Sequence, residues 1–152
     1  REVLTTGAVS GNPVVDVRVI VYDGKHHSVD SKEIAFVTAG KKAFQAAILA
    51  ARPIVLEPIV DIEITVPDSA MGDITGDLSS RRGQVSGTAN GPLGTMVVRG
   101  QAPLSELTNY QSRLNAMTQG QGRYTLALSH YDPVPPAIQQ QLAASFKIKD
   151  EE

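Results

Sequence analysis

The stretch Met71-Gly72-Asp73-Ile74-Thr75-Gly76-Asp77-Leu78-Ser79-Ser80-Arg81-Arg82-Gly83 lies between two segments whose side chains alternate between apolar and polar. Its own apolar residues recur at helical spacing, which predicts a helix with one apolar face. Arg81 and Arg82 stand at the C-terminal end of this helix, where cations are favoured. Gly83 is placed to leave the helix through a backbone conformation that other residues resist. The arginine pair fits either a capped surface helix or a phosphate contact.

Alternating side chains predict strands on both sides of this helix. Val60, Ile62, Ile64 and Val66 alternate with polar residues before it, as in a half-buried strand. After it we expect a strand at 84–89, a turn at 90–94, a strand at 95–101, a helix opened by Pro103 that buries Leu107, Tyr110, Leu114 and Met117, and a strand at 123–131. The order β-α-β-β-α-β predicts a ferredoxin-like α+β domain over residues 57–134. A short helix at 137–146 and a charged tail complete an expected C-terminal segment, 135–152.

Residues 1–56 predict a thinner domain. A helix end at 1–6 is stopped by Gly7, and four valines (Val15, Val17, Val19 and Val21) line one face of an expected strand. An exposed polar tip follows, formed by Lys25, His26, His27 and Ser28. A helix capped by Asp30 or Ser31 then runs to about Ala51 and carries a stripe of small and apolar side chains for packing on a sheet. These elements are too few for a whole domain, so we expect a fragment of a longer protein.

Composition limits the classes of function. The chain has no Cys and a net charge of -2, which excludes disulfides and thiolate metal sites and is unlike a free-standing DNA-binding domain. Residues 1–56 carry seven Lys/Arg against five Asp/Glu, whereas residues 57–152 carry seven against eleven. A nucleic-acid contact must therefore be local. No apolar run is long enough to cross a bilayer.

Motifs for catalysis or cofactor binding are absent from the sequence. It contains no GxxxxGK[ST] phosphate loop, and His26 and His27 are adjacent, so on a strand end their side chains point apart. The run Ser129-His130-Tyr131-Asp132 holds the residue types of a catalytic triad, but neighbours on a strand face opposite ways. The expected strand at 95–101 lacks the stacking aromatics of an RNA-recognition motif. We therefore expect no catalytic, metal or cofactor site.

Several stretches together resemble the C-terminal end of bacterial-type translation elongation factor G. They are Gly11-Asn12-Pro13-Val14-Val15-Asp16-Val17, Tyr22-Asp23-Gly24, His27-Ser28-Val29-Asp30-Ser31, Glu33-Ile34-Ala35-Phe36, Leu56-Glu57-Pro58-Ile59, Met71-Gly72-Asp73, Gly76-Asp77-Leu78, Arg81-Arg82-Gly83, Pro103-Leu104, Thr118-Gln119-Gly120 and His130-Tyr131. They cover nearly the whole chain in the family's order and spacing. The resemblance implies that residues 1–56 are the second half of the family's fourth domain, which resembles ribosomal protein S5, and that the following domain is the fifth.

The resemblance also implies a function. It places the loop from Asp23 to Val29 at the tip that enters the decoding region of the small ribosomal subunit, beside tRNA and mRNA. His27 matches the family's tip histidine, and Lys25, His26 and Ser28 flank it. The fifth domain is expected to meet large-subunit RNA near the sarcin–ricin loop and the L11 stalk base. The GTPase domain, which binds GTP and Mg, lies upstream, so this cytoplasmic, monomeric, non-membrane piece is not itself an enzyme.

Contacts with ribosomal RNA are also expected from arginines. Of Arg81 and Arg82, we expect one to pair with an acid such as Asp77, and the other to meet ribosomal RNA or the interface between the two domains. Arg123 is expected to contact RNA from its turn.

The sequence departs from the family at a few positions and leaves alternatives open. Ser79 stands where Asn is common, Gln121 replaces an arginine in the 118–122 turn, and Thr108-Asn109 replaces a usual Phe-Gly. The family resemblance implies a factor that promotes GTP-dependent translocation of tRNA and mRNA during elongation. These changes point to the alternative, a divergent paralogue that acts in ribosome recycling or ribosome protection. The alternative outside the family is a regulatory βαββαβ module that senses a small ligand.

Overall fold

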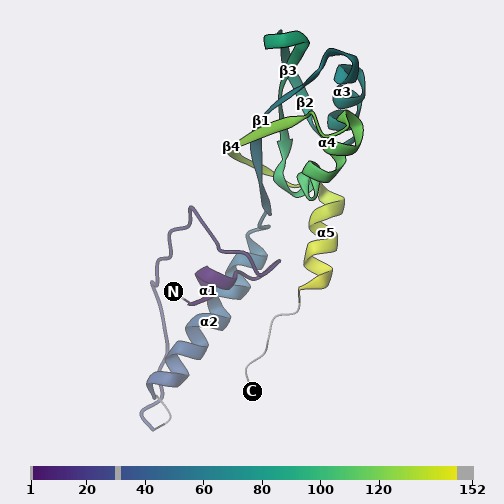
Figure 1. Cartoon of the computed structure of the whole chain (residues 1–152). Coiled ribbons are helices and arrows are strands. Elements are labelled where there is room, and N and C mark those ends of the chain that lie inside the picture. The colour runs from purple at the N-terminus through teal and green to yellow at the C-terminus, as the bar shows by residue number, and fades with distance from the viewer. Residues whose placement is uncertain (1, 30–31, 147–152) are drawn as a thin grey trace. The chain divides into compact units, whose positions relative to one another are not determined.

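The computed structural model describes residues 2–29 and 32–146. By their internal contacts they form two compact units. One, named here the sheet unit, is Leu56–Pro133. The other, named the helical unit, comprises residues 1–55 and 134–152. Figure 1 shows the elements of each unit.

The sheet unit is an antiparallel sheet with two helices on one face (Figure 1). Its main elements are β1 (Leu56–Pro67), α3 (Met71–Ser80), β2 (Gln84–Asn90), β3 (Thr95–Pro103), α4 (Tyr110–Thr118) and β4 (Arg123–Pro133). The strand order is β2-β3-β1-β4, and all three neighbouring pairs are antiparallel. This confirms the predicted α+β class and the β-α-β-β-α-β order.

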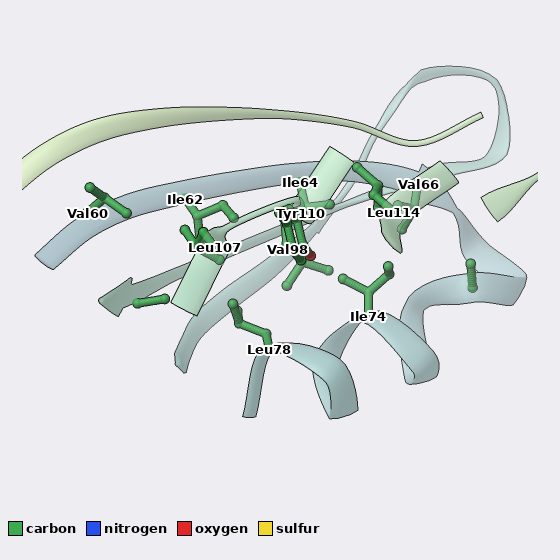
Figure 2. Close-up of a cluster of buried hydrophobic side chains, with 12 residues drawn as sticks. Val60, Ile62, Ile64, Val66, Ile74, Leu78, Val98, Leu107, Tyr110 and Leu114 are labelled. Atoms are coloured by element: carbon green, nitrogen blue, oxygen red, sulfur yellow. The ribbon is translucent and has the colours of Figure 1, made fainter. Parts of the chain in front are cut away.

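The core of the sheet unit lies between β1 and the two helices. Every second residue of β1 from Val60 to Val66 is buried, as the alternating pattern predicted. Ile74 and Leu78 of α3 and Leu114 of α4 are each 0% exposed and lie over this strand (Figure 2). The helical spacing read in 71–83 therefore identifies the face of α3 that covers the sheet.

The helix predicted from Pro103 is interrupted. A short 3-10 turn, η3 (Leu104–Leu107), comes first, and α4 begins only at Tyr110. Asn109 lies between them in the left-handed region, with φ 59°. Asn tolerates this conformation better than most residues, so the chain changes direction there. The predicted apolar face survives the break, because Leu107, Tyr110 and Leu114 are buried and Met117 packs against them.

The chain leaves α3 through a left-handed residue, as predicted, but that residue is not Gly83. Arg82, with φ 57°, is left-handed, and Gly83 is not. The Gly83 N–H donates to the Leu78 carbonyl at 2.9 Å, which closes the helix end. A Cβ on Gly83 would lie 2.6 Å from Leu78 Cγ and 2.7 Å from Leu78 O. Gly83 is therefore required by close approach rather than by its φ.

The helical unit contains three helices, α1 (Glu2–Thr6), α2 (Glu33–Ala50) and α5 (Pro136–Ser145), among its described residues. Gly7 ends α1 as predicted, with φ 60° and an N–H that donates to the Val3 carbonyl. The predicted capping residues of α2, Asp30 and Ser31, lie outside the described residues, and Lys32 occupies the N-cap. None of the described helices has the length and apolarity needed to cross a membrane.

The prediction of a strand at Val15–Val21 is wrong, because the structure has no strand there. Residues 17–27 form no regular element. Val15, Val17 and Val21 are 61%, 47% and 86% exposed. A strand exists only when its N–H and C=O groups pair with a neighbour, and none of the described strands pairs with this segment. For the same reason the predicted packing stripe of α2 is largely uncovered, with Phe36 52% exposed.

Gln139 ties α5 to the segment that precedes β1. Its side-chain amide donates to the Pro53 carbonyl at 3.1 Å and accepts from the Val55 N–H at 3.0 Å. The Val55 carbonyl in turn accepts from the Val134 N–H at 2.9 Å. The Val134–Val55 bond continues the antiparallel pairing of β1 and β4 by one residue, and the Gln139 side chain holds the backbone of Pro53 and Val55 from α5.

Candidate functional site

The predicted tip is an exposed loop of the helical unit. Lys25, His26, His27 and Ser28 are all exposed in it. At its start the Asp23 carboxylate accepts from the Gly24 N–H at 2.7 Å. At its end the His27 Nδ1 accepts from the Val29 N–H at 3.4 Å, so a neutral ring carries its proton on Nε2. The loop thus presents a cation and two imidazoles to solvent, a set suited to phosphates and stacked bases.

Arg82 lies at the centre of an ion-pair network in the sheet unit. Its two terminal nitrogens donate to the two Glu57 oxygens at 2.7 and 2.8 Å, which is a bidentate pair. Its Nε donates to Glu106 at 2.9 Å. Hydrogen bonding to Glu57 raises the pKa of Arg82 well above its usual range, although burial opposes the shift. The side chain therefore joins the start of β1, the end of α3 and η3.

Arg81 forms the second part of this network. Its Nε donates to Asp77 at 2.8 Å, which confirms the predicted pair, and one terminal nitrogen donates to the Glu106 carbonyl at 2.6 Å. Its guanidinium lies 5.4 Å from the centre of the Tyr110 ring, within cation–π range. Both arginines, not one of them, are engaged by carboxylates. Their contact with ribosomal RNA stays a prediction.

Arg123 begins β4 and is exposed. Within the described part of the chain it makes no ion pair, in contrast to the two arginines that follow α3. The structure places it in the sheet unit and the tip residues in the helical unit. The seven predicted contact residues therefore form three separate groups on two units: the tip, the α3 end and the start of β4.

A hollow of about 490 Å³ lies against α3 and α4. It is lined by Gly72, Asp73, Gly76, Asp77, Ser80, Arg113 and Met117. The Asp77 carboxylate is only 8% exposed and accepts from both Arg81 and Arg113, at 2.8 and 3.2 Å. Its charge is thus already paired within the protein. In the described ranges, no group of three His, Cys, Asp or Glu is arranged to hold a metal ion.

A β-bulge brings together residues that sequence reasoning placed apart. The β1–β4 register shifts between Ile59 and Val60. At this point Ser129 Oγ lies 3.0 Å from His130 Nδ1, although strand neighbours normally face opposite ways. His130 Nε2 lies 3.0 Å from Asp132 Oδ2. The assumption that these neighbours are separated was wrong, but the group is exposed and forms no part of the hollow described above.

Tyr110 is a buried titratable residue of the sheet unit. It is 1% exposed, and its ring meets the Tyr124 ring edge to face at 5.1 Å. Among the described residues its hydroxyl has no hydrogen-bond partner. Burial raises the pKa of Tyr110 to about 12, and the charge of Asp77 adds to the rise while Arg81 opposes it. The phenol is therefore held neutral in the folded protein.

We expect the Tyr110→Phe variant to resist alkaline unfolding. The wild type keeps the full contribution of neutral Tyr110 below about pH 10, where an unfolded tyrosine ionises, and loses it as the pH rises towards about 12. Urea unfolding at pH 8 and pH 11 measures this difference. The variant should also gain up to about 1 kcal/mol at pH 8, because a buried hydroxyl without a partner is removed. Tyr131→Phe, at a tyrosine that is 56% exposed, should change neither value. Equal alkaline losses in wild type and Tyr110→Phe would contradict the prediction.

Comparison with known proteins matches both parts of the chain to one family. A model of elongation factor G domain IV matches residues 1–52, and a model of the elongation factor G C-terminus matches residues 54–142. An elongation factor G-like protein of Thermotoga maritima is 41% identical over 142 residues, which are 93% of this chain and 21% of the relative. A crystal structure of a protein from Thermus thermophilus matches with a TM-score of 0.74 at 37% identity, over 93% of this chain and 21% of that one. The chain thus spans about a fifth of the length of either relative.

Proposed function

Because the chain belongs to the elongation factor G family, we propose that it is the ribosome-binding C-terminal part of a translational GTPase. In this proposal the parent protein promotes GTP-dependent movement of tRNA and mRNA during elongation. GTP and its Mg ion are bound by a domain upstream of this chain. The exposed tip loop, in the part that matches domain IV, is the single observation that supports a contact with RNA in the decoding region.

The tip loop has the composition that a contact with folded RNA needs. Lys25 supplies attraction to phosphates that does not depend on sequence. The His27 ring, oriented by its bond from the Val29 N–H, stacks on a base or donates to a phosphate. The tip acts by geometry: rearrangements driven by GTP elsewhere move the domain, and the loop prevents tRNA and mRNA from slipping back.

The sheet unit is proposed to meet large-subunit RNA near the sarcin–ricin loop and the L11 stalk base. The Arg82 network makes its α3 end a rigid surface, since the guanidinium is fixed by three hydrogen bonds to carboxylates. Arg123, which has no ion pair among the described residues, is the arginine of this unit best placed to meet a phosphate. The fragment acts as a monomer in the cytoplasm and has no enzymatic activity of its own.

A divergent paralogue is the second candidate. The relative from Thermotoga maritima is described as elongation factor G-like, at 41% identity. A factor of this kind would share the fold and act in ribosome recycling or ribosome protection instead of translocation. The decisive difference is whether the full-length protein moves tRNA and mRNA at all.

We expect His27→Ala in the full-length protein to slow translocation about fivefold, the effect of losing one hydrogen bond or stacking contact at the tip. GTP hydrolysis should stay unchanged, because the GTPase domain is not altered. A single-turnover translocation assay with parallel measurement of phosphate release tests both rates.

His130→Ala is the matched control, because His130 is also exposed but lies in the sheet unit. It should translocate at the wild-type rate. Wild-type translocation by His27→Ala would show that the tip histidine is dispensable. A wild type that hydrolyses GTP on ribosomes without translocating would favour the paralogue.

A further inference from the structure

The β2–β3 hairpin is uncharged. From Gly83 to Val98 the sequence contains no Asp, Glu, Lys or Arg, although 20% of the whole chain is charged. Arg82 and Arg99 flank this stretch, and most residues of β2 are exposed. An exposed surface without cations is poorly suited to a phosphate backbone. The exposed side chains of β2 are uncharged, and most of them are polar (Gln84, Ser86, Thr88 and Asn90).

Leu93 stands at the turn of this hairpin and is 102% exposed. Its backbone is left-handed, with φ 56° and ψ 37°. A branched apolar residue in this region costs roughly 1 kcal/mol or more relative to glycine or asparagine. Leu93 therefore strains the turn, and its side chain gains no burial from folding in return.

The turn around Leu93 is held in one shape by its neighbours. The Gly91 N–H donates to the Thr95 carbonyl at 2.7 Å, and the Thr95 hydroxyl donates to the Pro92 carbonyl at 2.7 Å. Gly91 is close against Thr95, whose Oγ1 would lie 2.4 Å from an added Cβ. Figure 1 shows the turn joining β2 to β3. A rigid turn presents its side chain to a partner at a low cost in entropy.

We propose that Leu93 is an apolar anchor that inserts into an apolar pocket of a ribosomal protein. This inference rests on the proposed ribosome binding and adds to it a contact with protein rather than RNA. Strained backbone at residues other than glycine persists where the surrounding structure holds it, and it clusters at ligand clamps and other functional sites. Binding in the pocket removes the apolar surface of the leucine from water, and the uncharged hairpin around it leaves the interface without unpaired charges.

The test uses the full chain and purified ribosomes. Leu93→Asn keeps the left-handed backbone, because asparagine tolerates it, and removes the apolar side chain. Binding measured by co-sedimentation should weaken about tenfold, the loss of one buried leucine, while the melting temperature stays the same or rises. Leu104→Asn is the matched control, at an exposed leucine of η3 outside the hairpin, and should bind as the wild type. A diazirine analogue of leucine at position 93 should crosslink to a ribosomal protein.

Three results would overturn the proposal. If the wild-type chain binds ribosomes and Leu93→Asn binds them equally tightly, Leu93 is not an anchor, and the proposed function is unaffected. Crosslinks to ribosomal RNA alone would show that the turn meets RNA. Failure of the wild-type chain to bind ribosomes at any accessible concentration would remove both the proposed function and the anchor.

Discussion

Replacing Arg82 with alanine should lower the free energy of unfolding by about 2–3 kcal/mol. The variant removes both hydrogen bonds to the Glu57 carboxylate, whose side chain is only 10% exposed. The remaining contact within reach is the Ser105 hydroxyl at 3.5 Å. Removing one partner of a buried pair leaves a carboxylate that is neither paired nor hydrated, which costs about 3–5 kcal/mol. The expected value is smaller because the Arg82 side chain is itself 30% exposed.

Arg99→Ala is a close control for this prediction. Arg99 Nε lies 2.7 Å from Glu63, the same distance as the Arg82–Glu57 pair, but these side chains are 60% and 47% exposed. An exposed pair of this kind contributes at most about 1 kcal/mol. Urea unfolding of the whole chain, followed by circular dichroism, compares the two variants. Alanine also tolerates the left-handed backbone no better than arginine, so strain at position 82 is unchanged.

A double variant distinguishes two causes of the lost stability: the carboxylate of Glu57 left without its partner, and the shortening of the Arg82 side chain itself. Adding Glu57→Gln to Arg82→Ala should recover about 1 kcal/mol, because a buried amide costs less to desolvate than a buried carboxylate. Equal destabilisation by Arg82→Ala and Arg99→Ala, or no recovery in the double variant, would show that the Glu57 pair contributes little.

The sheet unit could be predicted from the sequence because its signals are local. Ile62 and Ile64 alternate with acids along β1, and Ile74 and Leu78 recur at helical spacing in α3. In each of these elements, the spacing of a few apolar residues identifies the face that is buried. The order of the elements then limits the topology to a small number of arrangements, of which the ferredoxin-like one is observed.

The helical unit could not be predicted in the same way. The valine pattern at 15–21 describes a strand correctly only if another strand pairs with it, and that information lies outside the pattern itself. Exposure of Val17 at 47% and of Phe36 at 52% shows the consequence. Alternation predicts which face a strand would bury, and it does not supply the surface that covers it.

The role of Arg82 was missed because its partners are distant in sequence. Glu57 and Glu106 lie 25 and 24 residues away, so no local pattern links them. The left-handed backbone at Arg82 also contradicts the propensity rule that assigns such positions to glycine. Similarly, Leu93 reads as an ordinary turn residue until its exposure and its φ are known. Sites built from long-range pairs and strained backbones are where local rules fail.

Gly83→Ala should destabilise the protein by about 2 kcal/mol, the cost of overpacking a filled site. The added methyl group would lie 2.6 Å from Leu78 Cγ and 2.7 Å from the Leu78 carbonyl oxygen. Leu78 is 0% exposed, and its carbonyl accepts from the Gly83 N–H at 2.9 Å, so neither group has room to retreat. Relief requires that the end of α3 opens, which also moves Arg82 away from Glu57.

Gly76→Ala makes the same chemical change in the interior of α3, the helix that ends before Gly83, and its expected effect has the opposite sign. A Cβ at Gly76 meets nothing within 4 Å, and the residue has an ordinary helical φ. Alanine there should stabilise the protein by up to about 1 kcal/mol through helix propensity. Urea unfolding of both variants measures a difference of about 3 kcal/mol between two identical substitutions. If both changes move stability in the same direction, close packing at Leu78 is not what requires a glycine at position 83.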